Sequence, residues 1–293
     1  QSNYLHTVFS VASSLGMDYL VIPDGSVNIG TANIDFAKYT QMIRNAKAIE
    51  LFQKMGYKII GFETGLDFLN LSNADIYYGA GLNWKPGDQF QLTDFERLFI
   101  DSSMARVIFD SDSTKIKQWL KIMKPPEQIV YNRTLFQFNQ IEQIPEIPGK
   151  KFTYLHIQGP HKPYVFTPSG NFTFSPNEMK GYVPEVQYLN RRILELITVL
   201  KSKSSVPPII LIQGDHGWPN SYRAPILSAY YLPGVDQDVF YPSISPVNSF
   251  RLVFNQYFGT SYPMLEDHTY FALDDKPTER LEKPQTCAPA IQP

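Results

Sequence analysis

The sequence predicts an α/β fold with a mostly parallel central sheet, and three observations support this prediction. Residues 209–212 are four consecutive aliphatic residues after Pro207 and Pro208, a pattern typical of a short strand buried on both faces in the middle of a parallel sheet. A helical pattern at 36–55 leads directly into a strand pattern at 57–62, which is half of a βαβ unit. A second clear strand pattern lies at 151–157 and, like the first, ends in polar residues.

Length and composition indicate a globular chain with enough material for one substantial core. The 293 residues fit one large α/β domain or two small ones, and 43% hydrophobic with 18% charged residues is ordinary for such domains. A net charge of −2 with scattered Lys and Arg predicts no nucleic-acid partner. No apolar run is long enough for a transmembrane helix. The single cysteine, Cys287, excludes an internal disulfide framework and a multi-cysteine metal site.

The N-terminal half is expected to begin with a loop and a helix, because polar residues give way to an apolar helical pattern that ends near Gly16. The patterns that follow predict, in order, a helix at 36–55 ended by Gly56, a strand at 57–62, a short strand at 75–79 and a loop at 82–91. Helices are then predicted at 93–109, 113–123 and 133–143, which together form an α-rich insertion over about 92–145.

The C-terminal half is expected to complete the same domain, which then covers residues 1–272. After the strand at 151–157, the predicted elements are a long amphipathic helix at 177–203, the strand at 209–212, a strand at 225–232, a loop at 233–242 and a helix at 247–258 ended by Gly259. Beyond Glu266 the composition becomes polar and rich in proline, so residues 273–293 are expected to form an extended or disordered tail.

Thr7 is the first candidate site residue. It lies in the N-terminal turn of the first expected helix, where a hydroxyl most often caps the helix. A hydroxyl at this position is also a candidate nucleophile, because the helix dipole and the free N–H groups stabilise an oxyanion or a phosphoryl group. A bound metal would in addition lower the pKa of the hydroxyl. Both interpretations are open at this point.

Asp215 and His216 follow the strand at 209–212 and are flanked by Gly214 and Gly217, which allow a sharp turn and leave room for a ligand. A carboxylate beside an imidazole at the carboxyl end of a strand suits zinc, or manganese with more oxygen ligands. The alternative is a carboxylate that caps the next turn beside an uninvolved histidine. An isolated Asp-His-Gly does not decide between the two.

His161 is the third candidate, in the strand-end loop Gly-Pro-His-Lys-Pro-Tyr at 159–164. The two prolines exclude a helix there, and Gly159 permits a tight turn. A lone histidine in such a loop is often a structural, hydrogen-bonded residue. Its place between two prolines at a strand end makes it a candidate for ligand binding as well.

Three separated stretches, 4–15, 159–164 and 213–217, occur in the order and spacing of the sulfatase-like branch of the alkaline phosphatase superfamily. The chain resembles in particular bacterial proteins similar to lipoteichoic acid synthase and phosphoglycerol transferases. Residues 230–234 and 241–248 also resemble the C-terminal part of that branch, so the resemblance covers most of the chain.

The resemblance implies a three-layer α/β/α sandwich with one divalent metal, Mn, Zn or Mg, at the carboxyl ends of the strands. In the positions that match, Asp215 and His216 are metal ligands, Thr7 is the nucleophile and His161 contacts the oxygens of the transferred group. The implied activity is that of a metal-dependent hydrolase or transferase of phosphate or sulfate esters, with a covalent intermediate on Thr7. Arylsulfatases carry a modified cysteine as nucleophile, and its absence here disfavours sulfate chemistry of that kind.

The family also uses an acidic metal ligand upstream of the nucleophile, but only six residues precede Thr7, and Asp18 and Asp24 follow it. The first strand and one ligand are therefore expected to be missing, so the chain is interpreted as a piece of a longer protein. As given, it is expected to bind metal weakly and to turn over poorly or not at all.

The resemblance further implies a parent protein outside the cytoplasm, periplasmic or at the cell surface and anchored in a membrane. Its substrate would be a small-molecule ester or an ester linked to a lipid or glycan. The alternative is a catalytically inactive sulfatase-like domain that binds a glycan or a lipid head group.

Overall fold

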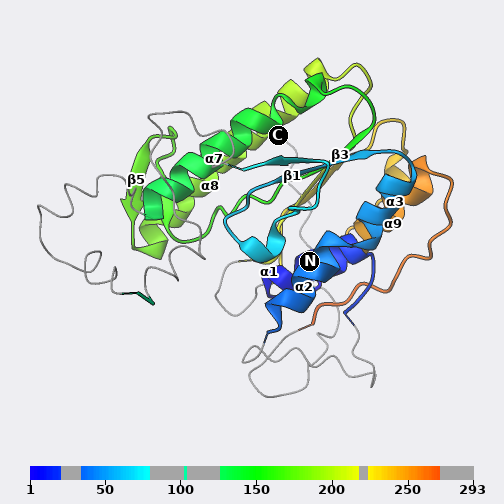
Figure 1. The fold of residues 1–293 in the computed structure, drawn as a ribbon, viewed down its shortest axis with the longest axis horizontal. Helices are drawn as coiled ribbons and strands as arrows, with labels where there is room; N and C mark the ends of the chain where they lie inside the picture. The colour runs from blue at the N-terminus through cyan, green and yellow to red at the C-terminus, as the bar shows by residue number, and fades with distance from the viewer. Residues whose placement is uncertain (21–33, 80–101, 104–125, 218–223, 271–293) are drawn as a thin grey trace, which may run out of the picture.

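The computed structural model describes residues 1–20, 34–79, 102–103, 126–217 and 224–270 (Figure 1). These residues form a mixed α/β fold with a small parallel sheet of three strands in the order β2-β1-β3. The central strand β1 (Lys58–Phe62) pairs in parallel with β2 (Ile76–Tyr78) and with β3 (Lys151–Tyr154). The prediction of an α/β fold with parallel strands is confirmed at this level.

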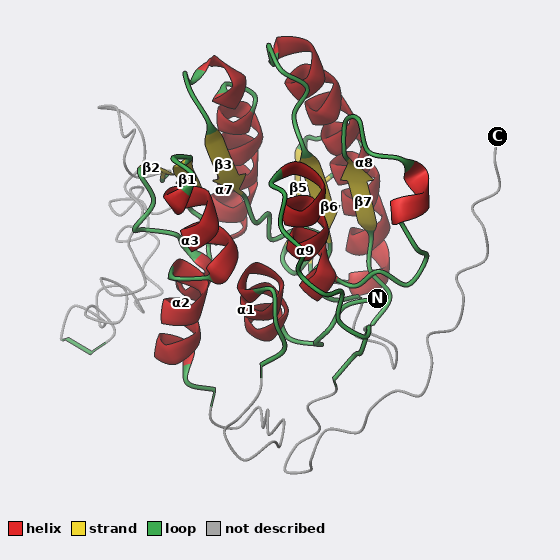
Figure 2. Ribbon diagram, turned by 90° about the vertical axis from the view of Figure 1, so that its right-hand side faces the viewer, coloured by secondary structure: helices red, strands yellow, loops and turns green. Residues whose placement is uncertain are grey.

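Helices and two antiparallel strand pairs complete the described part of the fold (Figure 2). The α-helices are α1 (Thr7–Gly16), α2 (Phe36–Arg44), α3 (Lys47–Lys54), α7 (Pro126–Ile141), α8 (Glu178–Lys203) and α9 (Pro246–Tyr257). Short 3-10 helices are η2 (Asp67–Leu69), η3 (Ile144–Glu146) and η4 (Gln237–Val239). The strand pairs are β4 (Tyr164–Phe166) with β5 (Phe172–Ser175), and β6 (Ile210–Gln213) with β7 (Ser228–Tyr231).

The parallel sheet buries side chains on both faces because successive residues of a strand point to opposite sides. Phe152 and Tyr154 of β3 pack against the largest apolar cluster, which contains residues of α1, α3 and α9. Ile60 and Phe62 of β1 point to the other face and pack against Ile144 of η3. The sheet is therefore held in place from both sides by residues distant in sequence.

Helix α1 is fixed at its C-terminal end by a buried arginine of α9. The helix ends at Gly16, as expected, and Met17 then adopts a left-handed conformation with φ 58°. The Nε of Arg251 donates a hydrogen bond to the carbonyl of Met17 at 2.7 Å. This contact sets the direction of α1, so it also sets the position of Thr7 at the opposite end.

One strand prediction is wrong. Residues 209–212 were expected in the middle of a parallel sheet, but β6 pairs antiparallel with β7, and its residues are half buried. An apolar run reports the burial of a strand and not the direction of its neighbour. Here β7 follows after a connection rich in turn formers, and antiparallel strands need no crossover helix.

Most other elements agree with the predictions apart from their ends, with one predicted helix divided in two and one hairpin that was not predicted. Helix α8 begins after Asn177, whose side chain accepts a hydrogen bond from the amide of Lys180, as a capping residue does. The helix expected at 133–143 begins earlier, at Pro126, because proline is well suited to the first turn of a helix. The helix expected at 36–55 is two helices, and the strands expected at 151–157 and 225–232 are shorter. The β4–β5 hairpin was not predicted.

Several predictions fall outside the described residues. These are the loop at 82–91, nearly all of the helices at 93–109 and 113–123, and the tail at 273–293, so that of the α-rich insertion mainly α7 is described. Among the described residues, none of the helices combines the length and the apolar character needed to cross a membrane.

Candidate functional site

Helix α1 presents the hydroxyl of Thr7 to the residues that follow β6. Thr7 is the first residue of the helix, after His6, whose side chain does not cap it. The Oγ1 atom of Thr7 lies 3.3 Å from Nε2 of His216, although the two residues are 209 positions apart in sequence. The structure thus brings together two of the predicted site residues, and the Thr7 hydroxyl is directed at the site rather than at its own helix.

The hydrogen bonds of His216 define what its ring can do. Nδ1 lies 3.0 Å from the carbonyl oxygen of Gly217, which can only accept a hydrogen bond. In the neutral imidazole, Nδ1 therefore carries the proton and Nε2 keeps its lone pair. This lone pair faces Thr7 and also Asp215, whose Oδ2 is 3.5 Å from Nε2.

Asp215 is held in its charged form. Burial by itself raises the pKa of this carboxyl, but the neighbouring His156 and His216 and the hydrogen bonds from the Thr7 hydroxyl and the His216 amide bring the pKa below its usual value. The carboxylate remains partly accessible, with 23% of its side-chain surface exposed, and the His216 ring is 14% exposed. A partly exposed carboxylate beside an imidazole lone pair is able to bind a cation.

The spacing of these three side chains fits a divalent metal. A tetrahedral ion with ligand distances of about 2.0–2.1 Å places neighbouring ligand atoms about 3.3–3.4 Å apart. The Nε2 atom of His216 lies 3.3 Å from Thr7 Oγ1 and 3.5 Å from Asp215 Oδ2. Within the described part of the chain, no three His, Cys, Asp or Glu side chains gather as a metal site. The hydroxyl of Thr7 is a candidate ligand because of its contact with His216.

His156 is a site residue that was not singled out from the sequence. It lies two residues beyond β3, and burial lowers the pKa of its ring. Asp215 opposes this shift, while His216 and His161 add to it, so these three groups all lie within electrostatic reach of His156. The alternation of Phe152 and Tyr154 along β3, continued by His156 two residues beyond its end, was the signal that could have identified it.

His161 is exposed at the tip of its loop, away from hydrogen-bond contact with Thr7. Its Nδ1 lies 2.7 Å from the carbonyl oxygen of Lys162, and the peptide bonds before Pro160 and Pro163 are cis. Its ring influences the pKa of His156 and is therefore near the site. Among the described contacts, none joins it directly to Thr7.

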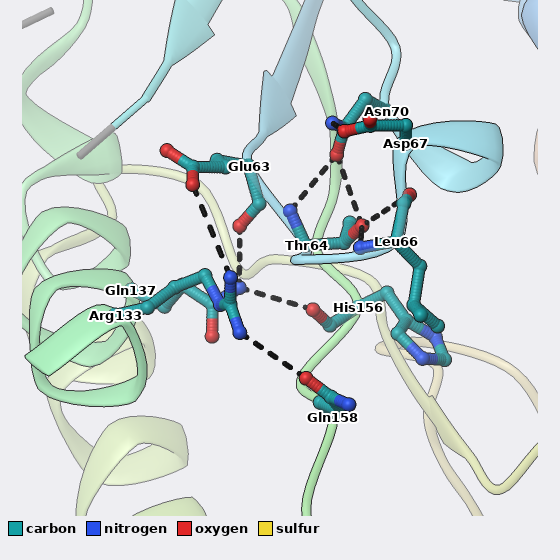
Figure 3. Close-up of polar contacts among 9 residues, drawn as sticks. All are labelled: Glu63, Thr64, Leu66, Asp67, Asn70, Arg133, Gln137, His156 and Gln158. Atoms are coloured by element: carbon teal, nitrogen blue, oxygen red, sulfur yellow. Dashed lines mark hydrogen bonds and ion pairs between the residues drawn. The ribbon is translucent and has the colours of Figure 1, made fainter. Parts of the chain in front are cut away.

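A network from α7 ties the carboxyl ends of β1 and β3 together beside the site (Figure 3). The side-chain amide of Gln137 donates hydrogen bonds to the carbonyl oxygens of Glu63, at 2.7 Å, and His156, at 3.1 Å. Arg133 donates to Oε1 of Gln158 at 3.2 Å and lies 4.0 Å from a carboxylate oxygen of Glu63. This network fixes the backbone that carries His156 and leads to the His161 loop.

Comparison of the chain with protein-family models, with curated proteins and with solved structures gives no match. The side chains around Thr7 and His216 therefore carry the functional inference. They bring together a hydroxyl, a charged carboxylate and an imidazole lone pair, with two further histidines nearby. This combination suits nucleophilic or metal-assisted chemistry on an anionic group.

Proposed function

We propose that the chain is a metal-dependent hydrolase or transferase that acts on phosphate or sulfate esters through a covalent intermediate on Thr7. The observation that supports this most directly is the 3.3 Å contact between Thr7 Oγ1 and His216 Nε2, beside the charged Asp215. These are residues that the resemblance to the sulfatase-like branch assigns to the nucleophile and the metal ligands.

Asp215 and His216 would hold the divalent metal, Mn, Zn or Mg, and their donor atoms and spacing fit this role. When bound, such an ion supplies charge stabilisation and lowers the pKa of a hydroxyl beside it. Carboxylate oxygen and imidazole nitrogen bind all three ions, so these two residues do not distinguish among Mn, Zn and Mg.

Thr7 is the residue that forms and breaks covalent bonds in this proposal. Its oxygen attacks the phosphorus or sulfur atom of the ester, the bond to the departing alcohol oxygen breaks, and that oxygen leaves with a proton. Water or an acceptor alcohol then displaces the Thr7 oxygen and restores the hydroxyl. The positive end of α1 favours the negative charge that gathers at Thr7 during both steps.

His161 would contact the oxygens of the transferred group from its exposed loop. An exposed imidazole between two prolines is well suited to meet a substrate that approaches from solvent. We extend the proposal to a three-layer α/β/α sandwich and to a parent protein that is membrane-anchored outside the cytoplasm. The substrate is then a small-molecule ester or an ester linked to a lipid or glycan.

The competing proposal is an inactive sulfatase-like domain that binds a glycan or a lipid head group. It requires no covalent chemistry at Thr7. Both proposals predict binding of an anionic or polar ligand beside His216, so turnover and its dependence on the Thr7 hydroxyl distinguish them.

The decisive experiment measures metal content together with hydrolysis of an aryl phosphodiester and an aryl sulfate, with Mn, Zn or Mg in excess. It compares the chain with Thr7→Val, which removes the hydroxyl at nearly constant shape, and with Thr7→Ser, which keeps it. Turnover that needs metal, persists in Thr7→Ser and disappears in Thr7→Val supports the enzyme.

Equal turnover in all three proteins would rule out Thr7 as the nucleophile. The same measurements are made on a chain extended upstream through the expected first strand. Ligand binding without any turnover in the extended chain would favour the binding domain, and absence of metal binding in the extended chain with each of the three ions would overturn the metal site. The ester that is hydrolysed faster shows whether the chain acts on phosphate or on sulfate esters.

A further inference from the structure

The hydroxyl of Tyr154 is buried and has no hydrogen-bond partner. Within the described residues only one other buried side-chain oxygen, Oγ of Ser2, is in the same situation. Buried polar groups in folded proteins are nearly always paired, since an unpaired one loses its hydrogen bonds to water without replacement. An unpaired hydroxyl beside a candidate site therefore indicates a partner that binds there.

The position of Tyr154, at the candidate site, indicates that the missing partner is a substrate. Tyr154 is the last residue of β3, at the carboxyl end of the parallel sheet, and its ring packs on the cluster that includes α1. His156 follows two residues later. The Tyr154 hydroxyl lies within electrostatic reach of Asp215, and as a neutral phenol it is able to donate a hydrogen bond.

A comparison with Tyr230 shows how this fold treats a tyrosine whose role is structural. The hydroxyl of Tyr230 accepts a hydrogen bond from Nε2 of Gln213 at 2.9 Å and lies 2.8 Å from Oγ of Ser249. These partners lie within the protein and join β6, β7 and α9. Tyr154 has the same chemical group at the end of β3, without such partners.

We infer that the Tyr154 hydroxyl donates a hydrogen bond to an oxygen of the phosphate or sulfate group bound beside Thr7. The inference rests on the proposed function and assigns a substrate contact to a residue outside the predicted site. A neutral phenol donor suits a tetrahedral oxyanion, whose oxygens only accept hydrogen bonds. It adds no charge beside the carboxylate of Asp215, with which the substrate must share the site.

The test compares Tyr154→Phe with Tyr230→Phe, which removes the same atom from a paired hydroxyl. Three quantities are measured: the melting temperature, the affinity for inorganic phosphate and sulfate by calorimetry, with and without Mn²⁺, and kcat/KM for an aryl phosphodiester. Tyr154→Phe is expected to melt at or above the wild-type temperature while oxyanion affinity and kcat/KM each fall about 10-fold to 100-fold. Tyr230→Phe is expected to melt lower, with oxyanion affinity unchanged.

The outcomes separate this inference from the proposed function. If Thr7→Val abolishes turnover while Tyr154→Phe keeps wild-type oxyanion affinity and kcat/KM, the enzyme stands and the role of Tyr154 is refuted. If the wild-type chain binds no oxyanion and hydrolyses no ester, both are refuted. A lower melting temperature in Tyr154→Phe, without loss of oxyanion affinity, would show that the hydroxyl is structural.

Discussion

The guanidinium group of Arg133 lies directly against the backbone of Gly65, in the space that a Cβ atom on that residue would occupy. Gly65 also has φ 85°, a left-handed conformation that side chains other than glycine adopt at a cost. The residue therefore serves two purposes. It turns the chain after β1, and it lets Arg133 reach Gln158 on the loop that leads to His161.

We predict that Gly65→Ala destabilises the protein more than Gly56→Ala does. Gly56 has a similar φ of 77° but nothing within 4 Å of a Cβ, so alanine there adds only backbone strain, about 1–2 kcal/mol. At Gly65 the same strain is joined by displacement of the Arg133 side chain. Chemical denaturation of the two variants measures the difference in the free energy of unfolding.

The double variant Gly65→Ala/Arg133→Ala separates the two effects. With the guanidinium removed, the alanine at residue 65 should add no more destabilisation than the alanine at residue 56. An extra cost that persists without Arg133 would show that the close approach of these residues has no energetic consequence.

Gln137 is predicted to be more important for stability than its neighbours on α7. Its amide bridges the carbonyl oxygens of Glu63 and His156, so Gln137→Leu removes one hydrogen-bond donor from each of these two part-buried acceptors. The expected loss of unfolding free energy is about 2–4 kcal/mol, with lower turnover because the backbone of His156 is released. Asn139→Ala, at an exposed position of the same helix, is the control. Equal effects of the two substitutions in denaturation experiments would argue against the bridge.

Loss of an outer-shell partner of a metal ligand weakens metal binding by roughly 10–100-fold. Asp215→Asn and His216→Gln are each predicted to weaken metal binding by more than this. Each substitution removes one of the two ligands that the metal proposal requires. Asp236→Asn, an exposed carboxylate on a loop, should leave metal affinity unchanged. Titration with Mn²⁺ or Zn²⁺ measures these affinities directly, independently of turnover.

Removal of metal by a chelator is predicted to abolish ester hydrolysis, and added Mn, Zn or Mg should restore it. The Nε2 lone pair of His216 faces Thr7, so without a metal it could instead accept the proton of the hydroxyl. Full activity after chelation, with the metal content verified as negligible, would therefore assign His216 the role of general base.

The periodic elements of this fold could be predicted from sequence because they depend on local pattern. The short strand patterns at 57–62 and 75–79 located β1 and β2, and the helical spacing from residue 177 onward located α8 almost to the residue. Asp215, His216 and Thr7 were chosen by residue type and position, and the contact between Thr7 and His216 is consistent with that choice.

The remainder depends on tertiary contacts that local pattern does not encode. The partner and direction of β6 are set by β7. The sequence between Pro163 and Ser175 has no regular apolar pattern, so the β4–β5 hairpin was not predicted from it. Tyr154 and His156 read as ordinary strand residues. Their place at the candidate site follows from the proximity of Asp215, which the fold brings near them.

Glu185 provides a prediction for pH dependence. The side chain is 2% exposed, and its carboxyl accepts a hydrogen bond from the amide of Val165 at 2.6 Å. Burial raises the pKa of this group from its usual 4.5 to about 7, against the effect of the hydrogen bonds from the amides of Val165 and Phe166. At neutral pH the folded protein therefore holds a carboxyl that is partly protonated.

The sign of the effect follows from the raised pKa. The folded protein binds the proton of Glu185 more tightly than the unfolded chain does. The contribution of Glu185 to the free energy of unfolding is therefore complete below about pH 4.5 and is lost as the pH rises through about 7. The loss is on the order of 3 kcal/mol. Glu185→Gln keeps an acceptor for the amide of Val165 and does not titrate, so its stability relative to wild type should increase over this pH range. Urea unfolding of both proteins at several pH values measures this difference in stability, with Asp238→Asn as an exposed control. Parallel pH profiles for wild type and Glu185→Gln would show that the pKa of Glu185 is not raised.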